Sequence, residues 1–347
     1  MKKSYEQLTL APFCYSVPSV GQSSKAIIIL FIPQLIMLFL TNSIASLILV
    51  ATAIAASVLA DISDSFARNR AYRLGSSVLL QGLLIGMFIP STYSQFKAFI
   101  IIYVSLLLTK YAFGGFAQAW ANPAAVAVIF LYLFGFSEFP AFLVDSSLLR
   151  QSDTLTKLIS SGKIPLCRFD KDITSFLNTN VLHYAGIALP DGYVSLFWDT
   201  GNIIPALRFN LLTLLATLYL ISFNLTEWLI PFVYLLTYAI TVRIFGLVPY
   251  GGLYFQGDIL LALCTSGTFV AAFFILPWGG TTPLTIAGKC IYAAFAGIFA
   301  FLLNGCGTGN IGTMFVILIM NVVSPFIQFI EDQIYLVFLN KKQRVEE

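Results

Sequence analysis

The residues best suited to form a binding pocket lie in the stretch KYAFGGFAQAWANPAAVAVIFLYLFGF, from 110 to 136. Asn122 is a good N-cap, because its side-chain oxygen can accept hydrogen bonds from the first backbone N–H groups of a helix. Pro123 suits the first helical position, where its missing N–H is not needed. Gly114 and Gly115 allow backbone angles that other residues avoid, so the chain can fold back just before the helix. Together these residues predict a sharp helix start.

The segment that follows Pro123 is apolar and suited to enter a bilayer. Its N-terminus would carry free N–H groups and a partial positive charge, which attract an anion or an electron-rich ring. Irregular backbone at membrane depth persists only where protein or a cavity surrounds it. The stretch therefore predicts either a polar pocket within the membrane or a simple helix cap at the headgroup level. Both interpretations stay open.

A second polar break opens the segment RLGSSVLLQGLLIGMFIP, from 73 to 90. Gly75 and Ser76 stand at its start and are further candidates for contact with a ligand. Gly75, Gly82 and Gly86 are spaced so that they share one helix face, and such small residues let helices pack closely. The segment therefore predicts a smooth packing strip that begins at a polar helix start.

Two charged residues lie beside later apolar segments. Asp258 begins one of them, where it is either an N-cap or part of an ion path. Arg208 could pair with an anion or extend its guanidinium to the membrane surface. The five cysteines are scattered and show no metal-binding spacing, so no metal site is expected and no catalytic residue is assigned.

The elements that must position these residues are membrane helices. Of 347 residues, 58% are hydrophobic and 10% are charged, whereas soluble proteins have about 25% charged residues. The mean hydropathy is +0.87. The apolar runs are too long and uniform for the alternating strands of an outer-membrane barrel. At about 20 residues per span, the chain is predicted to be an all-α integral membrane protein with about ten transmembrane helices and interrupted or half-helix entrances. The predicted spans lie near 26–42, 43–60, 76–91, 96–109, 121–136, 205–223, 227–245, 258–277, 288–304 and 310–330.

The distribution of charge predicts an orientation. Lys and Arg in short loops fall on one side, which should be cytoplasmic, and Lys110 is counted among them. We therefore expect one polytopic membrane domain over 1–347, with both termini in the cytoplasm. It would have a cytoplasmic tail over 1–25, an extracytoplasmic loop over 137–204 and a cytoplasmic tail over 331–347. A net charge of +3 does not indicate nucleic acid.

Four stretches resemble the NqrB/RnfD family of membrane subunits of ion-translocating NADH:quinone and ferredoxin:NAD oxidoreductases. LAPF with GSSVLLQGLLIGMFIP is similar to its Gly-Ser-Ala…Thr-Gly-Leu-Leu-Leu…Pro segment. TKYAFGGFAQAWANPAAVAV resembles its Lys-His…Gly-Gly-x-Gly-Gln-x-x-Phe-Asn-Pro-Ala segment, the most specific block. SGTFVAAFFILPWGGTTPLTIAGKC and IGTMFVILIMN resemble two later segments. The match covers most of the chain, and its length is most similar to RnfD.

The resemblance implies a subunit of a multisubunit Rnf- or Nqr-type complex that couples flavin electron transfer to Na⁺ or H⁺ movement across the lipid bilayer of the bacterial inner membrane. Such a subunit is part of a redox-driven pump and is not a complete enzyme alone. Family members carry FMN on a threonine of the extracytoplasmic loop, and some also hold riboflavin without a covalent bond. Here the loop reads FLVDSSLLRQSDTLTKLISSG, without an Ala-Thr pair. Thr154 is the first candidate for FMN and Thr156 the next, each of which requires a gap.

Three functions are compatible with the sequence. The first is the membrane subunit of the redox complex, with Asn122, Pro123, Gly114, Gly115, Gly75 and Ser76 as flavin contacts. The second is a stand-alone transporter or channel whose helix breaks bind a solute or ion. The third is a structural relative that keeps the fold and subunit contacts without a cofactor.

Overall fold

The computed structural model describes residues 18–115, 118–139, 165–186, 188–277, 281–307, 309 and 311–346, and within them it is helical without strands. The membrane helices of the first half are α1 (Val20–Leu40), α2 (Ile44–Ala67), α3 (Ser76–Met87), α4 (Gln95–Leu106) with its π-helical continuation η1 (Leu107–Tyr111), and α5 (Pro123–Phe134). Those of the second half are α10 (Asn210–Ser222), α11 (Leu229–Phe245), α12 (Ile259–Thr265) with α13 (Thr268–Val270) and the π-helical η7 (Ala271–Ile275), α14 (Ile286–Asn304) and α15 (Gly312–Glu346).

Helices therefore stand at every predicted span, but they differ in length. Five segments are long and apolar enough to cross a bilayer: Val20–Leu40, Ile44–Ala67, Leu229–Tyr250, Ile286–Asn304 and Gly312–Leu336. Helices α3 and α5 have 12 residues each, or about 18 Å, which is shorter than a hydrocarbon core of about 30 Å. The protein is a multi-pass membrane protein with interrupted helices, and the count of ten spans stays a prediction.

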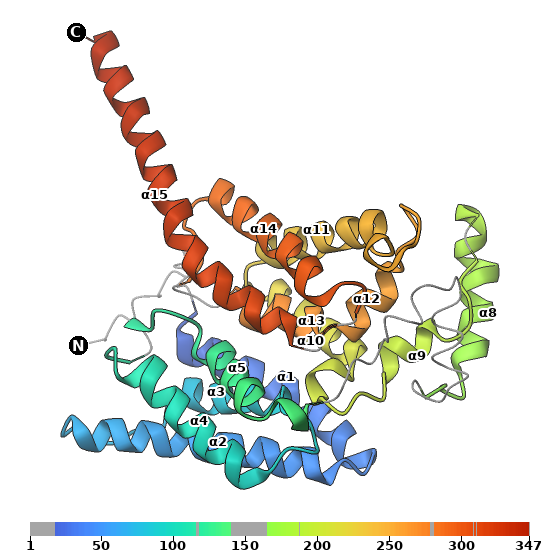
Figure 1. Cartoon of the computed structure of the whole chain (residues 1–347), viewed down its shortest axis with the longest axis horizontal. Coiled ribbons are helices and arrows are strands. Elements are labelled where there is room, and N and C mark those ends of the chain that lie inside the picture. Colours follow the sequence, from blue (N-terminus) through green and yellow to red (C-terminus); the bar gives the residue numbers. More distant parts are fainter. Residues whose placement is uncertain are drawn as a thin grey trace, which may run out of the picture.

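The two halves pack in a similar order. In the first half α2 packs on α3 and α4, and α4 packs on α5. In the second half α11 packs on α14, and α14 packs on α15. Figure 1 shows α2 to α5 on one side of the molecule and α11 to α15 on the other, while α1 contacts α10 and α5 contacts α15 across the middle. The series α2, α4, α5 and the series α11, α14, α15 thus pack in the same order.

Glycines determine how closely α2 and α3 approach. A Cβ added at Gly82 would lie 2.6 Å from the Cα of Ile54, and one added at Gly86 would lie 2.7 Å from the Cα of Val50. These two glycines form the predicted packing strip. Gly75 does not belong to it, because it is the N-cap of α3 and an added Cβ there would approach only Ser77 and Val78 of its own helix.

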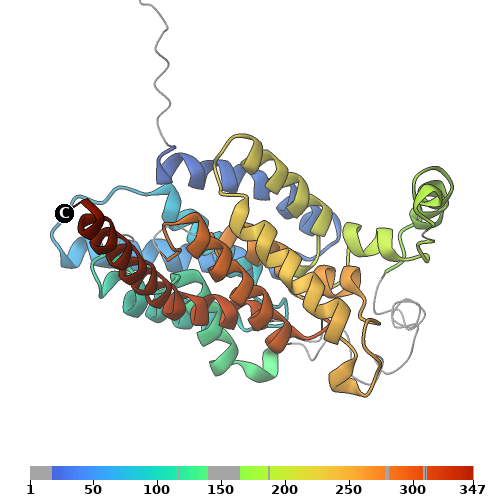
Figure 2. The ribbon, with the colours of Figure 1, turned by 90° about the horizontal axis from the view of Figure 1, so that it is seen from above.

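The predicted extracytoplasmic loop contains folded structure in its described part. It holds the short helices η3 (Phe136–Glu138), α8 (Asp170–Asn180), η4 (Leu182–Ala185) and α9 (Tyr193–Trp198). Figures 1 and 2 show α8 beside the bundle, not within it. The fully buried carboxylate of Asp170 joins α8 to α9, since it accepts from the backbone N–H groups of Gly192 and Ser195, both at 2.7 Å. Further along the chain, η5 (Pro205–Leu207) leads into α10, and η6 (Val248–Tyr250) follows α11.

Candidate functional site

Helix α5 begins as predicted. Asn122 has an extended backbone, and its Oδ1 accepts from the N–H groups of Ala124 at 3.0 Å and Ala125 at 3.4 Å. Pro123 occupies the first turn. The Nδ2 of Asn122 donates to the carbonyl of Ile275 at 3.2 Å, at the end of η7. Because only 2% of Asn122 is exposed, this helix start is a buried junction between the two halves, and its depth in the membrane stays a prediction.

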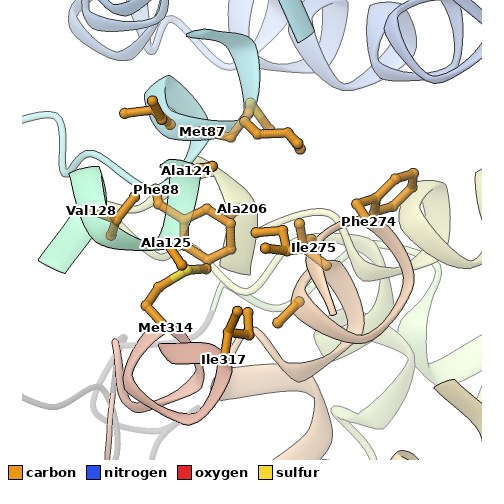
Figure 3. Close-up of a cluster of buried hydrophobic side chains, with 14 of the residues drawn as sticks. Met87, Phe88, Ala124, Ala125, Val128, Ala206, Phe274, Ile275, Met314 and Ile317 are labelled. Carbon is orange, nitrogen blue, oxygen red and sulfur yellow. The ribbon is translucent and has the colours of Figure 1, made fainter. Parts of the chain in front are cut away.

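Apolar side chains surround this junction. Figure 3 shows Phe88 next to Ala125 and Met314, with Ile275 and Ile317 close by. They come from the end of α3, the first turn of α5, η7 and α15, so the chain brings four separate segments to one place. The Oδ1 of Asn122 is already shared by two N–H groups. As described, the entrance to α5 fits a capping and packing role better than a flavin contact.

The glycine turn before α5 folds back as predicted. Gly114 and Gly115 have φ values of +110° and +108°, in the left-handed range that glycine adopts without strain. Their N–H groups donate to the carbonyls of Tyr111 at 3.2 Å and Lys110 at 2.9 Å, which closes the end of η1. A Cβ at Gly115 would meet nothing within 4 Å, so the requirement at that position is conformational, whereas a Cβ at Gly114 would also meet the side chain of Gln118.

Gly75 and Ser76 lie elsewhere. The Oγ of Ser76 donates to the carbonyl of Gly21 at 3.0 Å and ties the start of α3 to the start of α1. The opposite end of α3, about 18 Å away, is the one that reaches the α5 entrance through Met87 and Phe88. The structure thus does not bring Gly75 and Ser76 together with Asn122.

Asp258 is the N-cap of α12, where its Oδ1 accepts from the N–H of Leu261 at 3.0 Å. Its Oδ2 accepts from the hydroxyl of Tyr193 at 2.5 Å. Both carboxylate oxygens therefore have donors within the protein, and this contact holds α9 against α12. The N-cap interpretation is confirmed, while a role in an ion path stays a prediction.

Arg208 pairs with a carboxylate that sequence reasoning did not single out. Its Nε and Nη2 donate to the two oxygens of Asp199 at 2.7 and 2.9 Å, and its Nη1 donates to the Oγ of Ser43 at 2.6 Å. The side chains of the ion pair are 15% and 12% exposed. The guanidinium is therefore paired within the protein, as one of the two expectations for it held.

Lys110 does not lie in a loop, as the sequence had led us to expect, and its side of the membrane stays a prediction. The distribution of charge assigns it to a short cytoplasmic loop, but it lies in η1 and is 3% exposed. Its Nζ donates to the Oε1 of Gln81 on α3 at 3.0 Å. The only sequence signal is its place between two apolar stretches, LLT and YAF. Thr154 and Thr156 fall outside the described residues.

A bundle with five long apolar helices, interrupted helices and a buried, capped helix start between its halves defines a polytopic membrane protein. The model described as the NQR2, RnfD, RnfE family matches residues 7–335. The chain belongs to this family.

Several curated proteins are similar over most of their length. The D-type subunit of the proton-translocating ferredoxin:NAD(+) oxidoreductase complex of Clostridium ljungdahlii is 26% identical, over 94% of this chain and 95% of that protein. The D-type subunit of the Na(+)-translocating ferredoxin:NAD(+) oxidoreductase complex of Acetobacterium woodii is 26% identical over 77% and 75%. Its counterpart in the ion-translocating oxidoreductase complex of Aliivibrio salmonicida is 24% identical over 93% and 95%.

Proposed function

We propose that this chain is the D-type membrane subunit of an Rnf-type complex, which couples electron transfer between ferredoxin and NAD to ion movement. The observation that carries the proposal is the match to D-type subunits over nearly the full length of both chains. The interrupted, two-half bundle is the kind of architecture that membrane translocases use. The chain would work with the other subunits of the complex and not as a complete enzyme.

The transported ion is Na⁺ or H⁺. One similar protein is named as proton-translocating and another as Na(+)-translocating, so similarity alone favours neither. We place the chain in the inner membrane with both termini in the cytoplasm, because Lys and Arg of the short loops gather on the side of the termini. When Lys110 is left out of the count, the excess of Lys and Arg on that side still includes Arg68, Arg70 and Arg73 in the loop before α3.

FMN or riboflavin belongs to the proposal as the cofactor. Flavin would supply one- and two-electron transfer, while the protein would bind and orient it. Thr154 is the first candidate for a covalent FMN, although the loop lacks the Ala-Thr pair of the family motif. Asn122 could offer a flavin at most its amide group, and that group already caps α5 and bonds to Ile275.

Those two features, the altered loop motif and the filled α5 entrance, favour a second candidate function. In it the chain keeps the fold and the subunit contacts of the family but carries no flavin. Its helix junctions would then serve packing, and electrons would pass through partner subunits alone. The flavin content of the purified complex distinguishes this candidate from the first.

The test is purification of the affinity-tagged full-length chain from its own membranes in a mild detergent. We expect iron–sulfur and flavoprotein subunits to co-purify in fixed ratio, and the preparation to reduce NAD with ferredoxin and take up ions in vesicles. Yellow colour that stays with the denatured protein would identify covalent flavin. Flavin that is released on denaturation would identify a cofactor bound without a covalent bond. A chain that purifies alone and transports a solute in vesicles would instead be a stand-alone transporter.

A further inference from the structure

Lys110 has an unusual place among the charged residues of the bundle. Of the charged side chains that the structure describes in the membrane helices, it is the one that is buried, at 3% exposed. It lies in the π-helical turn η1, and single π-helical turns often occur at functional sites. An ionisable residue inside a membrane bundle is expensive to keep and usually serves a function.

The direct partners of Lys110 are a neutral amide and an aromatic ring. Its Nζ donates to the neutral Oε1 of Gln81 and lies 4.8 Å from the ring centroid of Tyr111. None of the ion pairs among the described residues includes it. A carboxylate partner would hold the ammonium in its charged form. An amide oxygen accepts from either an ammonium or a neutral amine, so the hydrogen bond to Gln81 survives loss of the proton.

A carboxylate is linked to the residue that follows Lys110 in the chain, Tyr111. The hydroxyl of Tyr111 donates to the Oδ1 of Asp61 on α2 at 2.9 Å. The neighbouring Asp64 is already paired, since the Nε of Arg68 lies 2.6 Å from its Oδ1, and Arg68 also donates to the carbonyl of Tyr111 at 2.7 Å. Asp61 is half-buried.

The remaining elements around Lys110 add little charge. Helix α5 has no charged side chain, and α3 contributes only the neutral Gln81. Tyr72 lies in the loop before α3, close to Asp61. Burial raises the pKa of Tyr72, and the carboxylate of Asp61 raises it further by a smaller amount. Tyr111 thus stands between a buried ammonium, which contacts its ring face, and the carboxylate of Asp61, which accepts from its hydroxyl.

We propose that Lys110 and Asp61 exchange a proton during the working cycle of this chain, an inference that rests on the proposed function. An N–H bond of the ammonium breaks and an O–H bond forms on the carboxylate, so a charged pair becomes a neutral amine and a neutral acid. No electrons are transferred, and Asp61 passes the proton to or from water. The exchange changes the charge inside the bundle while the hydrogen bond to Gln81 is kept.

Variants of Lys110 in the purified complex test this in vesicles. Lys110→Arg holds its charge at every pH, so we expect ion uptake per electron to be lost while ferredoxin-dependent NAD reduction continues. Lys110→His should regain coupling only as the pH falls toward about 6.5. Lys97→Met is the matched control, because Lys97 lies on α4, which η1 continues, but is exposed and paired with Glu138. It should behave as the unaltered protein.

An infrared pH titration of the purified complex gives a readout that does not require transport. The carbonyl band of a protonated carboxylic acid should be lost in Asp61→Asn, and its titration should shift in Lys110→Arg and not in Lys97→Met. A coupling ratio and an infrared titration both unchanged in Lys110→Arg would overturn the proton exchange. If the unaltered complex moves no ions, the proposed function fails, and the infrared titration alone decides the exchange.

Discussion

The amide of Asn122 donates to the carbonyl of Ile275, at 3.2 Å and 153 positions apart in the chain. The same side chain caps α5 through its oxygen. One residue therefore both starts a helix of the first half and joins it to the end of η7 in the second half. Loss of this side chain should disturb the junction between halves and not only a local turn.

Two substitutions at Asn122 separate these roles. Asn122→Ser keeps an N-cap oxygen but is too short to reach Ile275, whereas Asn122→Leu loses both contacts. We expect Asn122→Leu to destabilise the protein by about 0.5–2 kcal/mol more than Asn122→Ser, the usual cost of a lost N-cap. Thermal unfolding of the detergent-solubilised protein measures the difference. Equal stability of the two variants would mean that the cap contributes nothing. Separately, unchanged flavin content and complex activity in both variants would show that Asn122 serves capping alone.

Gly82→Ala should force α2 and α3 apart. The new Cβ would lie 2.6 Å from the Cα of Ile54, which is backbone and cannot rotate away. Overpacking of this kind costs about 1–3 kcal/mol. Gly75→Ala is the control on the same segment, since its Cβ would approach nothing closer than 3.6 Å. Comparison of their unfolding temperatures is the measurement, and a Gly82→Ala protein as stable as Gly75→Ala would contradict the close contact.

Asp170→Ala should open the folded part of the extracytoplasmic loop. The carboxylate of Asp170 accepts from the N–H of Gly192 and from the N–H and hydroxyl of Ser195. Each hydrogen bond to a charged group contributes about 1.5–3 kcal/mol, and the substitution leaves these donors buried without an acceptor. Limited proteolysis of the segment that follows α8, which ends at Asn180, should become faster. Asp172→Ala, at an exposed position of the same helix, should leave the digestion pattern unchanged.

The ion pair of Lys97 and Glu138 predicts a small dependence of stability on pH. Two hydrogen bonds, the stronger effect from Lys97 and the next from the N–H of Ser94, hold the pKa of Glu138 below its ordinary value of 4.5. A lowered folded-state pKa stabilises the protein above pH 4.5, and this contribution is lost as the pH falls through the folded-state pKa. Because Lys97 is 59% exposed, we expect at most about 1 kcal/mol. Unfolding curves of the unaltered protein and of Glu138→Gln should converge in acid, and a gap that widens there would contradict the assignment.

Much of the architecture follows from rules that act over a few residues. Helix starts at Asn122 and Asp258 need only a side chain that reaches its own first turn. The fold-back at Gly114 and Gly115 needs only residues without a Cβ. Apolar runs of sufficient length predict membrane helices because exposed backbone is not tolerated in lipid. These features were correct from the sequence, since each is determined locally.

The sequence by itself thus determined a helical membrane protein, its helix starts and its glycine turn. Only the tertiary structure decided which residues meet: Asn122 with Ile275, Arg208 with Asp199, and Lys110 with Gln81. It also moved Lys110 from an expected loop into the bundle and removed Gly75 from the packing strip. The physical reason is that a hydrogen bond or ion pair depends on the relative position of two helices, which packing of the whole bundle sets and no short stretch of sequence contains.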